Sequence, residues 1–194
     1  MQFGKILTTA LFCTWSAAFA AATRAPGRPA EDGEFPMKQA PSTPDWQTFM
    51  QASDADRLKL WTYQTNRGRH LHDWSWGWRL GWVRVCGRSE ATFCAGVLQE
   101  ALLDKAVVVR AEAASALGRR YEQSANPAVV RMLAEAFGNS RNLRRGKPLF
   151  VQRRILYALH QIGGDGALEL GGTLAATDPS AMAYWQRLGQ TETK

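Results

Sequence analysis

Cysteine and histidine are scarce in this chain of 194 residues, which has three of each. So few thiols and imidazoles exclude a disulfide-dense scaffold and a protein with several metal centres. The sequence has no C-x-x-C pair, no nucleophile elbow and no zinc-protease motif, and His70 and His72 lack a third and fourth ligand. No run of alternating β-branched residues predicts a strand. These absences favour a non-catalytic all-α protein without metal or cofactor.

Apolar residues are plentiful, at 45% of the chain, and this fraction excludes a chain that is disordered throughout. The length fits one domain or a short array of small units. Lys and Arg number 24 against 17 Asp and Glu, so the formal net charge is +7.

Residues 1–20 have the pattern of a secretory signal peptide. Lys5 supplies the positive start, residues 6–20 are uncharged, and Ala18 and the last residue of that run are small, which suits cleavage before Ala21. An uncleaved membrane anchor is the alternative, although the run is short and carries several hydroxyl groups. We therefore expect an exported protein, periplasmic or extracellular, without a transmembrane span after cleavage.

The following residues are rich in proline, because residues 21–44 hold five of the eight prolines. Such a segment is typical of a flexible linker. The hydroxyl of Thr43 is expected to cap the first helix, with Pro44 as its first residue. The predicted organisation is a linker over 21–43, a Trp-rich helical cap over 44–89, helical repeats over 90–190 and a tail over 191–194.

Apolar residues recur at helical spacing in the second half of the chain, over residues 109–117, 129–137 and 151–159. The sequence also repeats itself: residues 97–102 resemble 132–137 at an offset of 35, and 109–117 resemble 151–159 at an offset of 42. The two offsets agree if residues 140–146 are an insertion. Recurring helix pairs bury their apolar faces by stacking. We therefore predict a short α-solenoid.

Two segments resemble a known family. The turn Leu102–Asp104 followed by the helix Val109–Gly118, VRAEAASALG, resembles the HEAT repeat in the form shared with phycobilin-lyase-type repeats. Ala158–Asp165 is similar to the same family's helix end and turn, although Gln152 replaces the usual Arg and His160 replaces the usual Gly. The resemblance implies an exported bacterial protein with stacked antiparallel helix pairs in a HEAT-like or ARM-type superhelix. It also implies a curved binding surface, and only occasionally an enzyme.

A Trp-rich stretch precedes the repeats. Trp74, Trp78 and Trp82 lie at i, i+4 and i+8, and an offset of 35 places them on the buried face of the next repeat. We interpret them as a core that closes one end of the solenoid, which leaves Trp76 as the exposed ring. The alternative is a platform on which sugar rings or nucleic-acid bases stack.

The mature chain keeps two cysteines, Cys86 and Cys94. An oxidising compartment favours a disulfide between them, which would connect the end of one helix to the start of its partner. Two buried free thiols are the alternative.

Positive charge is concentrated in residues 105–154, which contain eleven Lys and Arg against three Glu. Arg119 and Arg120 end a helix, where cations suit the helix dipole. The inserted loop offers donors for phosphate or carboxylate groups, although solvated charge is an equal alternative. The candidate binding residues are Arg119, Arg120, Arg131, Arg141, Arg144, Arg145, Lys147 and Trp76.

The leading hypothesis is an exported, monomeric, non-catalytic α-solenoid that binds a protein or peptide partner at the cell envelope. A second hypothesis is binding of an anionic polymer or lipid headgroup by the basic patch of residues 105–154. A third is a glycan-acting enzyme that uses the Trp-rich segment.

Overall fold

The computed structural model describes residues 37–144, 147–148 and 150–191. The predicted signal peptide, linker residues 21–36 and Arg145 lie outside the described residues. No helix in the described part of the chain has the length and apolar character needed to cross a bilayer.

The described residues form nine α-helices, two single-turn 3₁₀ helices and one pair of two-residue strands, so the predicted all-α class is confirmed. The elements are α1 (Thr43–Gln51), α2 (Asp54–Asn66), η1 (Leu71–Asp73), α3 (Trp76–Cys86), α4 (Phe93–Ala101), α5 (Val107–Arg120), α6 (Pro127–Phe137), η2 (Ser140–Asn142), β1 (Leu143–Arg144), β2 (Lys147–Pro148), α7 (Phe150–Ile162), α8 (Asp165–Ala175) and α9 (Pro179–Thr191).

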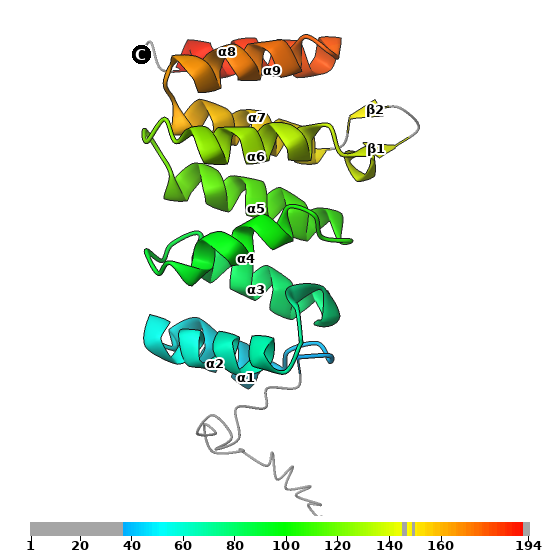
Figure 1. Ribbon diagram of the computed structural model, residues 1–194. Coiled ribbons are helices and arrows are strands. Elements are labelled where there is room, and N and C mark those ends of the chain that lie inside the picture. Colours follow the sequence, from blue (N-terminus) through cyan, green and yellow to red (C-terminus); the bar gives the residue numbers. More distant parts are fainter. Residues whose placement is uncertain (1–36, 145–146, 149, 192–194) are drawn as a thin grey trace, which may run out of the picture.

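The helices stack in layers from α1 and α2 at one end to α8 and α9 at the other (Figure 1). One row runs through the stack, because α5 packs on α3 and α7, and α7 also packs on α9. In the second row, α4 packs on α3 and α5, α6 packs on α7, and α8 packs on α6, α7 and α9. This packing is consistent with the predicted solenoid or with a bundle. The inserted segment forms η2 and the antiparallel β1–β2 pair, which projects from one side of the stack (Figure 1).

Local capping chemistry determines where the helices begin. The prediction that Thr43 caps the first helix is wrong, because the Oγ of Ser42 accepts the hydrogen bond from the Asp45 amide and α1 already includes Thr43. Pro44 then lies in the first turn, where a missing N–H costs nothing. Asn126 caps α6 in the same way, followed by Pro127 at the first position.

The aromatic cluster at the α1–α3 end confirms that three tryptophans of the Trp-rich stretch belong to the core. Trp74, Trp78 and Trp82 are buried, whereas 57% of the surface of Trp76 is exposed. The ring of Trp82 contacts those of Phe49, Trp61, Trp74 and Phe93 at centroid distances of 5.0–6.2 Å. The contacts with Phe49, Trp61 and Phe93 are edge-to-face, a geometry that adds to the gain from burying the rings.

The cysteines near these rings form the predicted disulfide. Cys86 is the last residue of α3 and is bonded to Cys94 in the first turn of α4. Both residues are buried. The disulfide therefore connects the two helices of one layer across a short turn.

Two buried guanidinium groups connect successive layers. Arg79 in α3 forms an ion pair with Asp104 in the α4–α5 turn, with 2.6 Å between Nε and Oδ2. Arg110 in α5 donates from Nε to Oδ1 of Asn142, which lies in the connection between α6 and α7, at 2.7 Å. Each arginine thus extends from the start of one helix to the next connection along the stack.

These contacts correct the predicted register of the Trp-rich helix. Because Arg79 and Arg110 occupy equivalent places, the true offset is 31 rather than 35. The glycines support this alignment, since a Cβ on Gly87 would lie 2.7 Å from Cβ of Ala116, and a Cβ on Gly118 would lie 3.0 Å from Cβ of Ala158. Both glycines permit close approach of the next layer.

Candidate anion-binding edge

The α4–α5 turn and the connection between α6 and α7 lie side by side because Arg110 binds both. Its Nη1 donates to the carbonyls of Asp104 and Lys105, and its Nη2 donates to the carbonyl of Arg141. Burial lowers the pKa of Arg110, Asp104 raises it and Arg141 lowers it. An arginine nevertheless remains charged in a protein. A buried cation therefore fixes the backbone of both connections.

Arg141 connects the same two segments from outside. Its side chain is exposed, and its Nη1 donates to the carbonyl of Leu103 at 2.9 Å. Immediately after it, β1 and β2 pair antiparallel, with Arg144 opposite Lys147. The basic insertion is thus held against the α4–α5 turn at its base.

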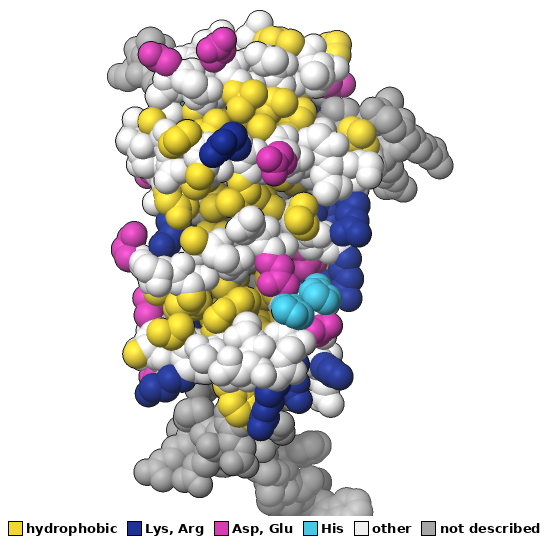
Figure 2. Space-filling model, viewed as in Figure 1, with side chains coloured by type: hydrophobic (Ala, Val, Ile, Leu, Met, Phe, Trp, Pro, Cys, Tyr) yellow, Lys and Arg dark blue, Asp and Glu magenta, His cyan; other side chains and the backbone are white. Residues whose placement is uncertain are grey.

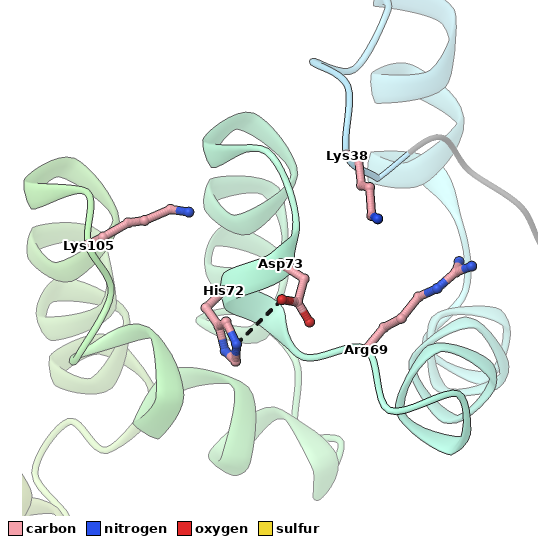
Figure 3. Close-up of a pocket in the computed structure, with 5 residues that line it drawn as sticks. All are labelled: Lys38, Arg69, His72, Asp73 and Lys105. Carbon is pink, nitrogen blue, oxygen red and sulfur yellow. Dashed lines mark ion pairs between the residues drawn. The ribbon is translucent and has the colours of Figure 1, made fainter.

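A pocket of about 520 Å³ opens beside this turn, lined by Lys38, Arg69, His72, Asp73 and Lys105 (Figure 3). The five side chains come from three separate segments: the residues before α1, the connection from α2 through η1, and the α4–α5 turn. In Figure 3 the side chains of Lys38, His72, Asp73 and Lys105 extend into the space between these segments, whereas the guanidinium group of Arg69 points away from the His72–Asp73 pair. Three permanent cations face one carboxylate, so the pocket is electropositive.

The pocket histidine lies between two carboxylates. His72 Nε2 is 3.4 Å from Oδ1 of Asp73, and its Nδ1 is 3.3 Å from Oε1 of Glu100. The ring of His70 stacks on that of His72 with centroids 5.5 Å apart. Within the described ranges, no group of three or more His, Cys, Asp or Glu could hold a metal ion.

Asp73 is fixed in its ionised form. Its Oδ2 accepts a hydrogen bond from the backbone amide of His70 at 2.9 Å. This bond lowers the pKa of Asp73, desolvation opposes it slightly, and the nearby His72, His70 and Lys38 lower the pKa further. The carboxylate thus orients the pocket histidine and keeps its negative charge.

We call Lys38, Arg69, Lys105 and Arg141 the basic edge. It lies where α4 and α6 end and where α5 and α7 begin, so the opposed helix dipoles offset one another and the side chains provide the positive charge. Figure 2 shows Lys and Arg side chains along one margin of the molecule, beside histidine and acidic side chains. Exposed apolar side chains accompany the cations, on the α4–α5 turn, at the beginning of α5 and α7, and on β1: Leu103, Val108, Phe150 and Leu143.

The structure divides the basic patch predicted for residues 105–154. Arg119 and Arg120 end α5, whereas Arg141 lies near its beginning, and a helix of 14 residues is about 20 Å long. Arg119 pairs with Glu112 at 3.0 Å, and Arg120 donates to the carbonyl of Ala91. These two arginines have structural partners at the far end and do not belong to the basic edge.

The other candidates are distributed as follows. Arg131 is exposed on α6, and Trp76 is exposed at the first position of α3. Arg144 and Lys147 are placed by their backbone pairing alone, and Arg145 lies outside the described residues. Of the predicted binding residues, only Arg141, at the base of the inserted loop, thus belongs to the basic edge.

Of the pocket cations, Lys105 falls within the basic patch predicted for residues 105–154, whereas sequence reasoning missed Lys38 and Arg69. Lys38 falls within the predicted linker, but Met37 beside it is buried and its carbonyl accepts from the Ser75 amide at 2.7 Å. No periodicity marks Lys38 or Arg69. Lys105 directly follows the turn Leu102–Asp104.

Comparison of the chain with protein-family models, curated proteins and solved structures gives no match. The resemblance to HEAT repeats therefore depends on the repeated residues themselves, and the function must be argued from the basic edge.

Proposed function

We propose that the chain is an exported, non-catalytic helical binding module that contacts a protein partner through its basic edge. The observation that carries this proposal is the gathering of cations from four separate segments at one end of the helices. Arg110 fixes two of those segments by buried hydrogen bonds. The edge is thus pre-organised, which lowers the entropic cost of binding.

The composition of the edge favours an acidic protein surface as the partner. Cations there alternate with exposed apolar side chains such as Leu103 and Phe150, which are 56% and 48% exposed. Protein interfaces combine an apolar centre with charges that provide specificity and speed association. Guanidinium groups bind carboxylates in a bidentate manner. A partner with Asp or Glu around an apolar segment matches this pattern.

The disulfide supports the export part of the proposal, because such bonds persist in oxidising compartments. Fractionation of the native cell should recover the protein outside the cytoplasm, with Ala21 as its first residue by N-terminal sequencing. A cytoplasmic protein that still begins at Met1 would contradict export.

Cross-linking in envelope extracts tests the binding function. The mature chain should cross-link to a partner, and the Lys105→Glu/Arg141→Glu variant should lose it. The Arg84→Glu/Arg88→Glu variant is the control, because it makes the same change of charge on exposed residues at the end of α3 and in the turn that follows, away from the basic edge. Equal recovery by both variants would refute a role for the basic edge.

The two remaining hypotheses have separate outcomes. If the protein bound anionic vesicles or polymers in a salt-sensitive manner and no protein cross-link formed, the partner would be an anionic polymer or lipid headgroup rather than a protein. The glycan hypothesis loses its main support, since Trp74, Trp78 and Trp82 form core contacts and only Trp76 of the four is exposed.

A further inference from the structure

We propose that the pocket lined by Lys38, Arg69, His72, Asp73 and Lys105 binds a phosphate monoester group. This inference goes beyond the protein-binding function and requires no protein partner. The pocket gathers three cations and one carboxylate, which give +2 before any proton on His72 is counted. A phosphate monoester is a dianion with three acceptor oxygens. It therefore complements the positive charge of the pocket and can accept hydrogen bonds from its ammonium and guanidinium groups.

Arg69 is held in place at the pocket wall. Its Nη1 donates to Oε1 of Gln64 at 3.2 Å, and its backbone amide donates to the Gln64 carbonyl at 3.1 Å. Gln64 is itself fully buried. A guanidinium carries five N–H donors in a planar fork, so one anchored donor leaves a fork that binds two phosphate oxygens.

The two lysines reach the pocket from opposite sides (Figure 3). Lys38 follows the buried Met37, whose carbonyl accepts from the Ser75 amide. The carbonyl of Lys105 accepts from Arg110. Both backbones are fixed, and the flexible side chains end apart from each other across the pocket (Figure 3), where each ammonium acts as a point charge toward phosphate.

Asp73 does not make the pocket unsuitable for an anion. One of its oxygens accepts from the His70 amide, and the other faces His72. The carboxylate is thereby engaged with neighbours on its own segment. Both ring nitrogens of His72 face carboxylates, those of Asp73 and Glu100, so the donors left for a phosphate are the three cations.

The size of the pocket indicates an ester rather than phosphate alone. Small-molecule sites have volumes of about 300–1,000 Å³, and this pocket has about 520 Å³. A phosphate group would fill part of it, which leaves space for an attached sugar, alcohol or lipid glycerol. The shared chemistry is a terminal phosphate, whose source is a free metabolite or a lipid headgroup.

Titration of the oxidised mature chain with glucose 6-phosphate, followed by NMR shifts and calorimetry, tests the proposal. We expect a Kd of about 1 mM or tighter, with shifts at the pocket residues and none with glucose. The Lys38→Gln/Lys105→Gln variant should weaken binding by about tenfold or more, because each lost bond to a charged group costs about that much. Lys59→Gln/Arg84→Gln, which removes two exposed cations elsewhere, should bind like the wild type.

Circular dichroism checks that both variants fold. The single variant Lys105→Met is a second test that should not disturb the fold, because the Lys105 side chain is exposed and only its backbone carbonyl accepts the hydrogen bond from Arg110. Binding to vesicles that contain phosphatidic acid would identify a lipid source, and binding of inorganic phosphate would identify the free anion. Loss of either binding in the Lys38→Gln/Lys105→Gln variant would support the site. No shifts at the pocket residues, or equal affinity of the pocket variant and its control, would overturn it. Arg141 remains intact throughout, so failure here leaves the protein-binding function separately testable.

Discussion

Arg110 in α5 and Asn142 in the α6–α7 connection are 32 residues apart, yet Nε of the arginine donates to Oδ1 of the asparagine at 2.7 Å. Both side chains are buried, at 2% and 0% exposure. Asn142 also donates from Nδ2 to the carbonyl of Ala136 at 2.8 Å. One side chain therefore fixes the end of α6 to the start of α5 and supports the base of the inserted loop.

Replacement of Asn142 by Ala should lower the free energy of unfolding by about 2–4 kcal/mol, because it leaves a buried charged donor and a buried carbonyl unpaired. Urea denaturation measures the change. Asn139→Ala is the control: it removes one exposed hydrogen bond to the Arg141 amide and should cost about 1 kcal/mol or less. Equal losses in the two variants would contradict the connecting role of Asn142.

Replacement of Gly118 by Ala should destabilise the contact between α5 and α7. The new Cβ would lie 2.9 Å from Cα of Ala158 and 2.6 Å from Oε1 of Gln161, so the backbones must separate. Overpacking of this kind costs about 1–3 kcal/mol. Thermal unfolding measures the effect.

Gly96→Ala is the matched control for that substitution. Gly96 lies in the middle of α4, and a Cβ there would meet nothing within 4 Å. The same change should therefore leave stability unaltered or raise it by about 0.5–1 kcal/mol. A Gly118 variant as stable as the Gly96 variant would show that the two helices do not need the close approach.

The periodic part of the fold was predictable because a helical face is encoded locally. The predicted apolar positions of α5, such as Val109 and Ala113, and those of α7, such as Ile155 and Leu159, are all buried. The same holds for Trp78 and Trp82 in α3 and for Trp74 just before it. A spacing of 3.6 residues needs no knowledge of what the helix packs against.

The register of α3 and the position of the pocket are determined by contacts between segments that are distant in the sequence. Arg79 is buried because Asp104 of the next turn pairs with it, and nothing near Arg79 in the sequence signals that pairing. Lys38 and Lys105 line the same pocket because Met37 docks near the start of α3. Sequence periodicity carries no information on such long-range contacts, so the cationic site could not be predicted.

Reduction of the Cys86–Cys94 disulfide should lower the free energy of unfolding by about 2–3 kcal/mol, as expected for closing a short loop. Because the bond connects α3 to α4, the loss should be largest at the aromatic end of the stack. Hydrogen exchange with and without a reductant measures this distribution. Equal protection of α3 and α4 in both forms would contradict the stabilising role.

Asp178 should make the start of α9 sensitive to acid. Its Oδ1 accepts hydrogen bonds from the Ser180 amide and hydroxyl and from the Ala181 amide at 2.5–3.0 Å. The Ser180 hydroxyl is the main cause that lowers the pKa of Asp178 below its ordinary value of 3.8, followed by the Ala181 amide. A carboxylate with a lowered pKa stabilises the folded state above the ordinary value, and this contribution is lost as pH falls through the lowered value.

The Asp178→Asn variant separates the hydrogen bonds from the charge. It keeps an acceptor for the two amides, so its melting temperature at neutral pH should lie within a few degrees of the wild type. As pH falls below the ordinary carboxyl value, the wild type should lose its advantage and the two melting curves should converge. Glu169→Gln, an exposed change in α8, controls for the general effect of acid. A difference between wild type and Asp178→Asn that does not depend on pH would show that the carboxylate charge contributes nothing to the cap.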